Sequence, residues 1–330
     1  MLMVSIHTTK LLDRDLSNAA TAQTRETAGP VLREIIDEGL RVAERCGRSA
    51  NERDVHLGTV FPFLHLLEML DGAEVCLGDS VVVPATVLLR AGFEALLTLE
   101  YVAREDSVRR GAAFVVVDVH DRIAEYDRLD DRTDRGKAFS ANVSRDHAPF
   151  TIRLPAEIDL DVRRDSLRKV LAKRHLGEAN QEYLRLSKSR RGRPKFYQLF
   201  GGPGDLEQLA RYLGRSAQYD VFYRQWSRTS HAADLRRQLR PAEDGSAAVS
   251  VLRDPRDMVH VYGMAMSLGL AGIHAMLTRY RSGEIEGGVH AVWYKQKGSP
   301  NTPVANAPAG RWRKCVNSLH LEGTPPRRKV

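Results

Sequence analysis

The chain has 330 residues, of which 42% are hydrophobic and 28% charged, a balance typical of folded globular proteins rather than disordered ones. Its three cysteines are too few and too widely spaced for a disulfide framework or a C-x-x-C metal knuckle, which favours a reducing cytoplasm. The net charge is +8, and residues 295–330 alone carry +7, which leaves a nearly neutral body. The charge is therefore weak evidence that the body binds nucleic acid.

The N-terminal half of the chain predicts a series of amphipathic and apolar helices. A break at Gly29-Pro30 separates the first two, because proline lacks the backbone donor that a helix interior requires. Asp79-Ser80 is expected to cap the long helix that follows it. The helices expected in this half cover residues 10–28, 31–47, 59–77, 81–105 and 107–131.

Residues 136–154 contain glycine and proline and are expected to be irregular. The segment 247–252 is expected to be a short strand or an extended connection. The segment Met258–Thr278 has no charged residue and is long enough to cross a membrane, but its histidines and glycines favour a core helix. The helices expected in this half cover residues 156–175, 178–190, 205–214, 216–232 and 255–282.

The chain shows no internal repeat and no run of alternating apolar residues, so we expect an all-α fold, a multi-helix bundle with a loose basic C-terminal extension. Three parts are predicted. They are an N-terminal helical segment (1–55), a helical core domain (56–282) and the basic extension (283–330).

One expected helix, Tyr219–His231, is rich in polar residues at helical spacing. Residues three, four and seven apart share a helical face, so one stripe collects a carboxylate, two guanidiniums, a hydroxyl and an imidazole. These residues are Asp220, Arg224, Ser227, Arg228 and His231. The stripe is interpreted either as a catalytic or anion-binding face or as a buried polar network that holds the bundle together.

A second motif lies in the expected helix 81–105, where Arg90 and Glu94 are one turn apart among apolar residues. We expect them to form a buried ion pair that contacts the Ser227–His231 face, because a buried charge needs a partner before it needs a substrate. The polar network of the alternative interpretation would consist of Arg90, Glu94, Asp220 and Tyr223.

These two motifs together, Arg90-x-x-x-Glu94 and Tyr223-Arg224-x-x-Ser227-x-x-x-His231, resemble an uncharacterised bacterial helical family, domain-of-unknown-function family 5677. The resemblance covers roughly residues 56–282. It implies a helical fold and no established activity.

The spacing Arg224-x6-His231 is also similar, more distantly, to the Arg-x(4–6)-His signature of HEPN-domain ribonucleases. Gln225 departs from that pattern, since many members have a smaller polar or acidic residue there. The resemblance implies a metal-independent RNA endonuclease, without a cofactor or a metal site, that is usually dimeric and acts as a toxin or defence effector. Its catalytic candidates here are Arg224, His231, Arg228 and Ser227.

The segment Ser189–Lys195 contains Arg-Gly-Arg-Pro and resembles the core of an AT-hook, whose arginines enter the minor groove of A·T-rich DNA. The candidate nucleic-acid-binding residues are Arg190, Arg191, Arg193 and Lys195. Arg190 stands where an AT-hook has proline, and a solvated basic loop is the alternative.

Two functional hypotheses follow. The first is the HEPN-like RNA endonuclease, with RNA as substrate, a homodimeric state and an antitoxin as partner. The second is a non-enzymatic helical interaction module that binds a protein, or RNA or DNA through its basic loop and tail. Both predict a cytoplasmic protein without a membrane partner. No phosphate-binding loop, dinucleotide fingerprint or nucleophile elbow is present in the sequence to suggest another activity.

Overall fold

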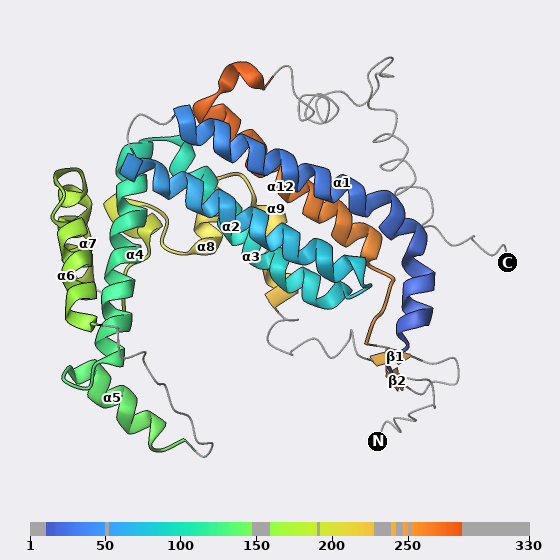
Figure 1. Ribbon diagram of the computed structural model, residues 1–330, viewed down its shortest axis with the longest axis horizontal. Helices are drawn as coiled ribbons and strands as arrows, with labels where there is room; N and C mark the ends of the chain where they lie inside the picture. Colours follow the sequence, from blue (N-terminus) through green and yellow to red (C-terminus); the bar gives the residue numbers. More distant parts are fainter. Residues whose placement is uncertain are drawn as a thin grey trace. The chain divides into compact units, whose positions relative to one another are not determined.

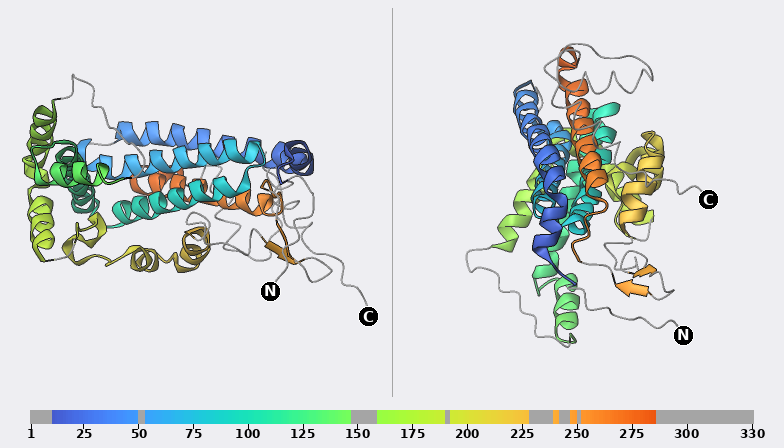
Figure 2. Two further views of the ribbon diagram at one scale, coloured as in Figure 1. Left: turned by 90° about the horizontal axis from the view of Figure 1, so that it is seen from below. Right: turned by 90° about the vertical axis from the view of Figure 1, so that its right-hand side faces the viewer.

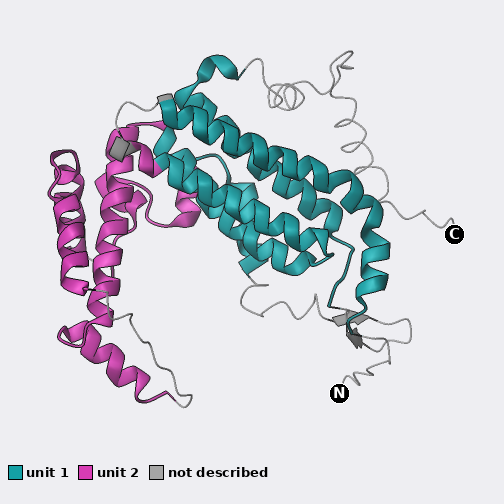
Figure 3. Ribbon diagram, viewed as in Figure 1, with its two compact units in different colours: residues 1–51, 59–103, 213–330 teal, residues 52–58, 104–212 magenta. Residues whose placement is uncertain are grey.

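The computed structural model describes residues 11–49, 53–146, 159–189, 192–227, 239–241, 247–249 and 252–285. The fold is all-α, as predicted, apart from one short antiparallel strand pair among these residues, β1 (Leu239–Pro241) with β2 (Ala247–Val249) (Figure 1). β2 lies within the segment for which a strand was one expectation. The chain divides into two compact units, unit 1 (residues 1–51, 59–103 and 213–330) and unit 2 (residues 52–58 and 104–212) (Figure 3).

The α-helices are α1 (Arg14–Ser49), α2 (Arg53–Gly78), α3 (Val82–Arg104), α4 (Ser107–Leu129), α5 (Asp134–Val143), α6 (Leu160–Leu171), α7 (Gly177–Ser189), α8 (Leu206–Tyr212), α9 (Ser216–Gln218) and α12 (Met258–Tyr280). Most of them overlap the predicted ranges, but α1, α5 and α9 differ from the prediction. The shorter or irregular turns are η1 (Arg174–Leu176), η2 (Phe196–Gly201), η3 (Tyr219–Gln225) and η4 (Ser282–Glu284).

Unit 1 is built on four long helices, α1, α2, α3 and α12, which lie side by side (Figures 1 and 2). Glycines let these helices approach closely. A β-carbon on Gly39 of α1 or Gly272 of α12 would lie 2.5 Å from Leu67 or Leu66 of α2, respectively. Large apolar side chains of α2 therefore fill the places where the neighbouring helices have no side chain, as close packing of a protein interior requires.

α3 and α12 are each long and apolar enough to cross a membrane by length and composition, and most of each is buried inside the structure. In the most apolar 18-residue stretch, the buried share is 56% for α3 and 72% for α12. The core role expected for residues 258–278 agrees with this burial, because apolar side chains that pack against other helices are already removed from water. The absence of a membrane partner stays a prediction.

The predicted break at Gly29-Pro30 is wrong, because α1 runs without interruption from Arg14 to Ser49 with Pro30 inside it. Pro30 is exposed, whereas Ala28 and Leu32 on either side are fully buried. α1 packs along α12 in unit 1, and this tertiary packing offsets the lost hydrogen bond. α1 consequently belongs to the same compact unit as α12.

Unit 2 is organised around α4, against which α5, α6, α7 and η2 pack (Figure 1). Its apolar core joins α4 to α7 and to the loop before α8. The buried members are Ala112, Ala113, Val116, Val117, Leu176, Ala179, Tyr183, Leu186 and Leu199. Unit 2 therefore has a hydrophobic core distinct from that of the four-helix bundle.

The expectation of irregular structure throughout 136–154 is wrong for its first part, since α5 continues to Val143. The side chain of Thr133 caps this helix by accepting a hydrogen bond from the amide of Gly136 at 3.0 Å. A β-carbon on Gly136 would overlap the backbone carbonyl of Asp130. Gly136 suggested a loop, but it lies in the first turn of α5, where only a residue without a side chain lets the helix backbone pass so close to the backbone of Asp130.

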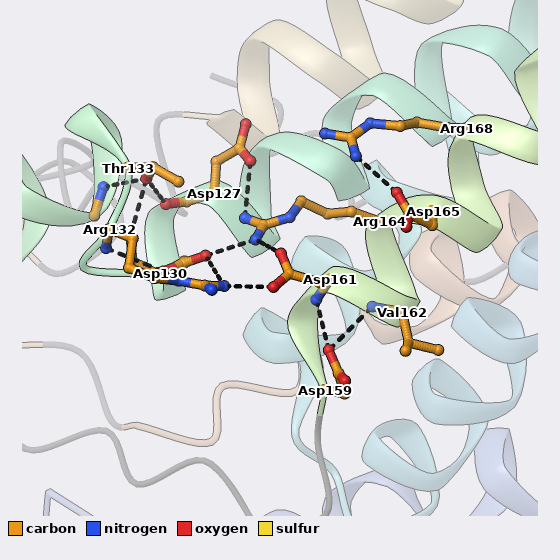
Figure 4. A network of polar contacts seen from close by, with 11 residues as sticks. Asp127, Asp130, Arg132, Thr133, Asp159, Asp161, Val162, Arg164, Asp165 and Arg168 are labelled. Carbon is orange, nitrogen blue, oxygen red and sulfur yellow. Dashed lines mark hydrogen bonds and ion pairs between the residues drawn. The ribbon is translucent and has the colours of Figure 1, made fainter.

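An ion-pair network with a buried pair at its centre, Arg164 and Asp130, ties α6 to the corner between α4 and α5 (Figure 4). The guanidinium of Arg164 donates to Asp130 and to Asp161 at 2.6 Å each, and to Asp127 at 3.2 Å. Arg132 donates to Asp130 and Asp161 as well. The hydrogen bonds from Arg132 and Arg164 hold the pKa of the Asp130 carboxyl well below its usual range. Because each charge in the network has partners, we interpret it as structural.

Candidate functional site

The candidate site is the aromatic segment that follows α8, and its helical geometry differs from the prediction. An α-helix was expected over 216–232, but after the short α9 the residues Tyr219–Gln225 form a π-helix, η3. Gly214, with φ of +75°, makes the turn that leads into this segment. π-helical turns are rare and are found frequently at functional sites. The α-helical hydrogen bonding predicted for the segment that carries the polar stripe is therefore wrong over residues 219–225, where the backbone is π-helical.

α3 packs against this segment through an ion pair, an aromatic stack and a cation–π contact. At its start, Arg215 forms a bidentate pair with Glu100, with 2.5 Å between the Arg215 Nε and a Glu100 carboxylate oxygen. Further along, the rings of Phe93 and Phe222 stack with centroids 5.3 Å apart. The guanidinium of Arg90 lies 4.5 Å from the centroid of the Tyr223 ring. These contacts reach Phe222 and Tyr223, so the expected contact of Arg90 and Glu94 with the Ser227–His231 face stays a prediction.

Arg90 and Glu94 do form an ion pair, with 3.4 Å between their charged atoms. The side chain of Arg90 is 21% exposed and that of Glu94 is 43% exposed. The expectation of a buried pair is therefore wrong for Glu94. The guanidinium of Arg90 also lies over the face of the Tyr223 ring.

Of the five residues of the predicted polar stripe, the structure describes Asp220, Arg224 and Ser227. Asp220 and Arg224 form an ion pair at 3.3 Å, and their side chains are 62% and 56% exposed. Arg224 also lies 5.7 Å from the centroid of Tyr219, whose ring stacks on that of Tyr223 at 4.9 Å. A chain of contacts through the rings of Tyr223 and Tyr219 therefore connects the guanidinium of Arg90 to that of Arg224. Ser227 follows η3 and is partly buried. Arg228 and His231 lie outside the described residues.

The basic loop is described only from Gly192 onward, so Arg190 and Arg191 lie outside the described residues. Arg193 donates to Asp121 of α4 at 2.7 Å. Lys195 is exposed and precedes η2. Arg193 could enter a minor groove only after leaving Asp121, so this contact favours the loop interpretation over the AT-hook interpretation.

Residues 60–246 match the model of DUF5677, a family of unknown function. The chain belongs to this family. No curated protein and no solved structure matches it. The DUF5677 match includes α3 and η3, and therefore both sides of the contact between Arg90 and Tyr223. It ends before α12, which the predicted resemblance had included.

Sequence reasoning missed two residues of this DUF5677 site, Glu100 and Arg215. They are 115 positions apart, and neither belongs to a spaced motif. Local periodicity carries no information about such a pair. The weak available signal was Glu100 itself, a carboxylate near the end of a strongly apolar helix, which predicts that a cation lies nearby.

Potential metal ligands do not converge in the part of the DUF5677 chain that the structure describes. None of its His, Cys, Asp and Glu side chains form a group of three or more that could hold a metal ion. The charged side chains of the candidate site pair with arginines instead, as in the contacts of Glu94, Glu100 and Asp220.

Proposed function

We propose that this DUF5677 protein is a metal-independent RNA endonuclease of HEPN-like type, with its site on the exposed side of η3 and the residues that follow. The observation that carries the proposal is the placement of Arg224. Arg224 lies in a π-helical turn, its side chain is 56% exposed, and it pairs with Asp220, whose side chain is 62% exposed. Exposed ion pairs are worth only about 1 kcal/mol or less, so an RNA phosphate can displace the carboxylate.

The chemistry assigned to the site uses the nucleophile that RNA itself carries, the 2′-hydroxyl. The 2′-oxygen would attack the adjacent phosphorus as the bond from phosphorus to the 5′-oxygen breaks, which leaves a 2′,3′-cyclic phosphate and a 5′-hydroxyl. His231 would accept the proton of the 2′-hydroxyl and return a proton to the leaving 5′-oxygen, because an imidazole can exchange protons near neutral pH. Arg224 and Arg228 would stabilise the charge that develops on the phosphorane, since a guanidinium is always charged and presents several donors. Ser227 would contribute a hydroxyl hydrogen bond to the same phosphate. This mechanism requires neither a metal ion nor a cofactor.

Cleavage of a single-stranded RNA by the purified chain tests the proposal. His231→Ala and Arg224→Ala should each abolish cleavage, and EDTA should leave it unchanged. Arg168→Ala is the matched control, because Arg168 is an exposed helical arginine paired with an acid three residues away, and it should cleave like the wild type. Cleavage that survives His231→Ala, or that requires Mg²⁺, would contradict the proposal.

The cellular role proposed with this activity is that of a cytoplasmic toxin or defence effector, active as a homodimer and restrained by an antitoxin. Expression of the wild-type chain should then arrest bacterial growth, whereas expression of His231→Ala should not. Equal growth of the two strains at equal protein levels would argue against this role.

A non-enzymatic interaction module is the second candidate, and one observation favours it. The cations of the site already have partners within the chain, since Arg90 contacts Tyr223 and Glu94, and Arg224 contacts Asp220 and Tyr219. Such contacts are typical of a polar network that stabilises a helical interface. Under this hypothesis RNA would be bound through the basic loop and tail and left uncut, and deletion of residues 296–330 would weaken binding more than Arg224→Ala.

A further inference from the structure

α3 contacts the Arg224-bearing segment at three points along one of its faces. Glu100, Phe93 and Arg90 are separated by seven and three residues, which places them on the same side of α3. Their partners, Arg215, Phe222 and Tyr223, follow in the opposite chain direction. The two segments therefore run antiparallel, with an ion pair at one end of the contact and a cation–π contact at the other.

The first of these contacts has the geometry of a fixed anchor. Arg215 offers two parallel donors to the Glu100 carboxylate, and a further donor of the same guanidinium reaches the side chain of Gln218. Both charged side chains are less than one-fifth exposed, so water competes little for the pair. The anchor lies directly before the first turn of α9, where the backbone of Arg215 also accepts a hydrogen bond from the amide of Tyr219.

The second anchor, the contact of Arg90 with Tyr223, reaches the segment three residues before Trp226, which is itself buried. Arg90 covers the ring of Tyr223, and Tyr223 stacks on Tyr219, the ring nearest to Arg224. Any movement of Tyr223 would therefore be passed to the residues that border Arg224. A continuous α-helix is the default for such a sequence, so the π-helical turn between the two anchors needs contacts that hold it.

We propose that Glu100 and Arg90 are positioning residues, which act on Arg224 from α3 by holding η3 in its π-helical conformation. Glu100 acts through Arg215, and Arg90 acts through Tyr223. The catalytic part of this inference rests on the proposed ribonuclease function, and the conformational part does not. Neither residue is expected to touch the RNA.

The test uses the full chain and two measurements, RNA cleavage and amide hydrogen exchange by peptide. Glu100→Gln and Arg215→Lys each break the bidentate ion pair between these two residues. Arg90→Met removes the cation over Tyr223 and keeps an unbranched side chain. Arg33→Lys is the matched control, because Arg33 pairs with Glu74 between two other helices of the same unit. All variants are first checked for cooperative unfolding, so that only folded proteins are compared.

The three test variants should lower kcat on the order of 10- to 100-fold, with KM changed far less, because misplacement of a catalytic group affects the chemical step. Peptides covering 216–227 should exchange faster than in the wild type, while peptides from α12 keep their protection. Arg33→Lys should change neither measurement. Wild-type kcat in folded variants, with or without faster exchange, would overturn the positioning role.

The inference and the proposed function can fail separately. If the wild-type chain does not cleave RNA, the ribonuclease proposal fails and hydrogen exchange alone decides the conformational inference. Faster exchange confined to 216–227 in the three variants would then support it. Unchanged exchange there, in variants that are folded, would overturn it.

Discussion

The side chain of Leu66 occupies the space that a β-carbon on Gly272 would need, since the two atoms would be 2.5 Å apart. The other methyl group of Leu66 would lie 3.3 Å from a β-carbon on Gly92 of α3. One leucine of α2 thus fits between glycines of two neighbouring helices. Leu66 is fully buried, in an interior that is expected to be closely packed.

Gly272→Ala should accordingly destabilise unit 1 by about 1–3 kcal/mol, because the added methyl group forces a buried side chain or a helix to shift. Gly263→Ala in the same helix is the control. No atom lies within 4 Å of the β-carbon that it would add, so it should stabilise the protein by roughly 0.5–1 kcal/mol through helix propensity. Urea unfolding measures both values, and equal effects of the two substitutions would contradict this packing.

Arg164→Met should cost on the order of 3 kcal/mol of folding free energy, because it leaves the buried carboxylate of Asp130 with one of its charged partners removed. Arg168→Met, one turn further along α6, should change stability by less than about 1 kcal/mol, since its pair with Asp165 is exposed. Thermal or urea unfolding of the two variants provides the comparison. A small effect for both would show that the network adds little to stability.

Arg90 and Glu94 should differ in their effects on stability. Glu94→Gln should cost less than about 1 kcal/mol, because the side chain is 43% exposed. Arg90→Met should cost more, since it also removes the contact with Tyr223, a kind of contact worth roughly 0.5–2 kcal/mol. A double-mutant cycle with Tyr223→Leu measures the coupling. Strict additivity of Arg90→Met and Tyr223→Leu would rule out an energetic role for the cation–π contact.

The stability of unit 2 should depend on pH through His120. Its Nε2 lies 2.8 Å from the side-chain oxygen of Asn180, and its ring stacks on Tyr183 at 4.0 Å. Burial lowers the pKa of His120 below its ordinary 6.5, so below that pH the unfolded chain binds more protons than the folded one. The stability that the neutral, buried His120 contributes to unit 2 is fully present above pH 6.5 and is lost as the pH falls towards the lowered pKa of the folded protein.

His120→Gln removes this titration and serves as the test. Urea unfolding at several pH values between 8 and 5 should show a smaller loss of stability in the variant than in the wild type. The other histidines are common to both proteins, so the difference isolates His120. Parallel pH profiles would contradict the assignment.

Helix boundaries were predictable where the cause is local. α3, α4 and α12 begin and end within about three residues of the predicted positions, because apolar periodicity and punctuation by charged residues act over a few neighbours. The motif containing Arg90 was also recognisable, since a charge in an apolar helix is unusual whatever surrounds it.

At Pro30 and Gly136 the prediction of helix ends from local sequence was wrong. Both residues interrupt helices in most settings, and both lie inside helices here. Pro30 is tolerated because α1 packs along α12 on both sides of it, and Gly136 is required because the backbone of Asp130 passes close by. The effect of a helix-breaking residue depends on contacts that its neighbours in the chain do not reveal.

The sequence by itself determined the helical class, the long helices and the two motifs of the family, because these depend on composition and on spacing within one helix. The tertiary structure alone decided that Glu100 meets Arg215, that Arg90 covers Tyr223 and that Tyr219–Gln225 is π-helical. The first two features join residues more than 100 positions apart, and such contacts form only when the segments that carry them pack together.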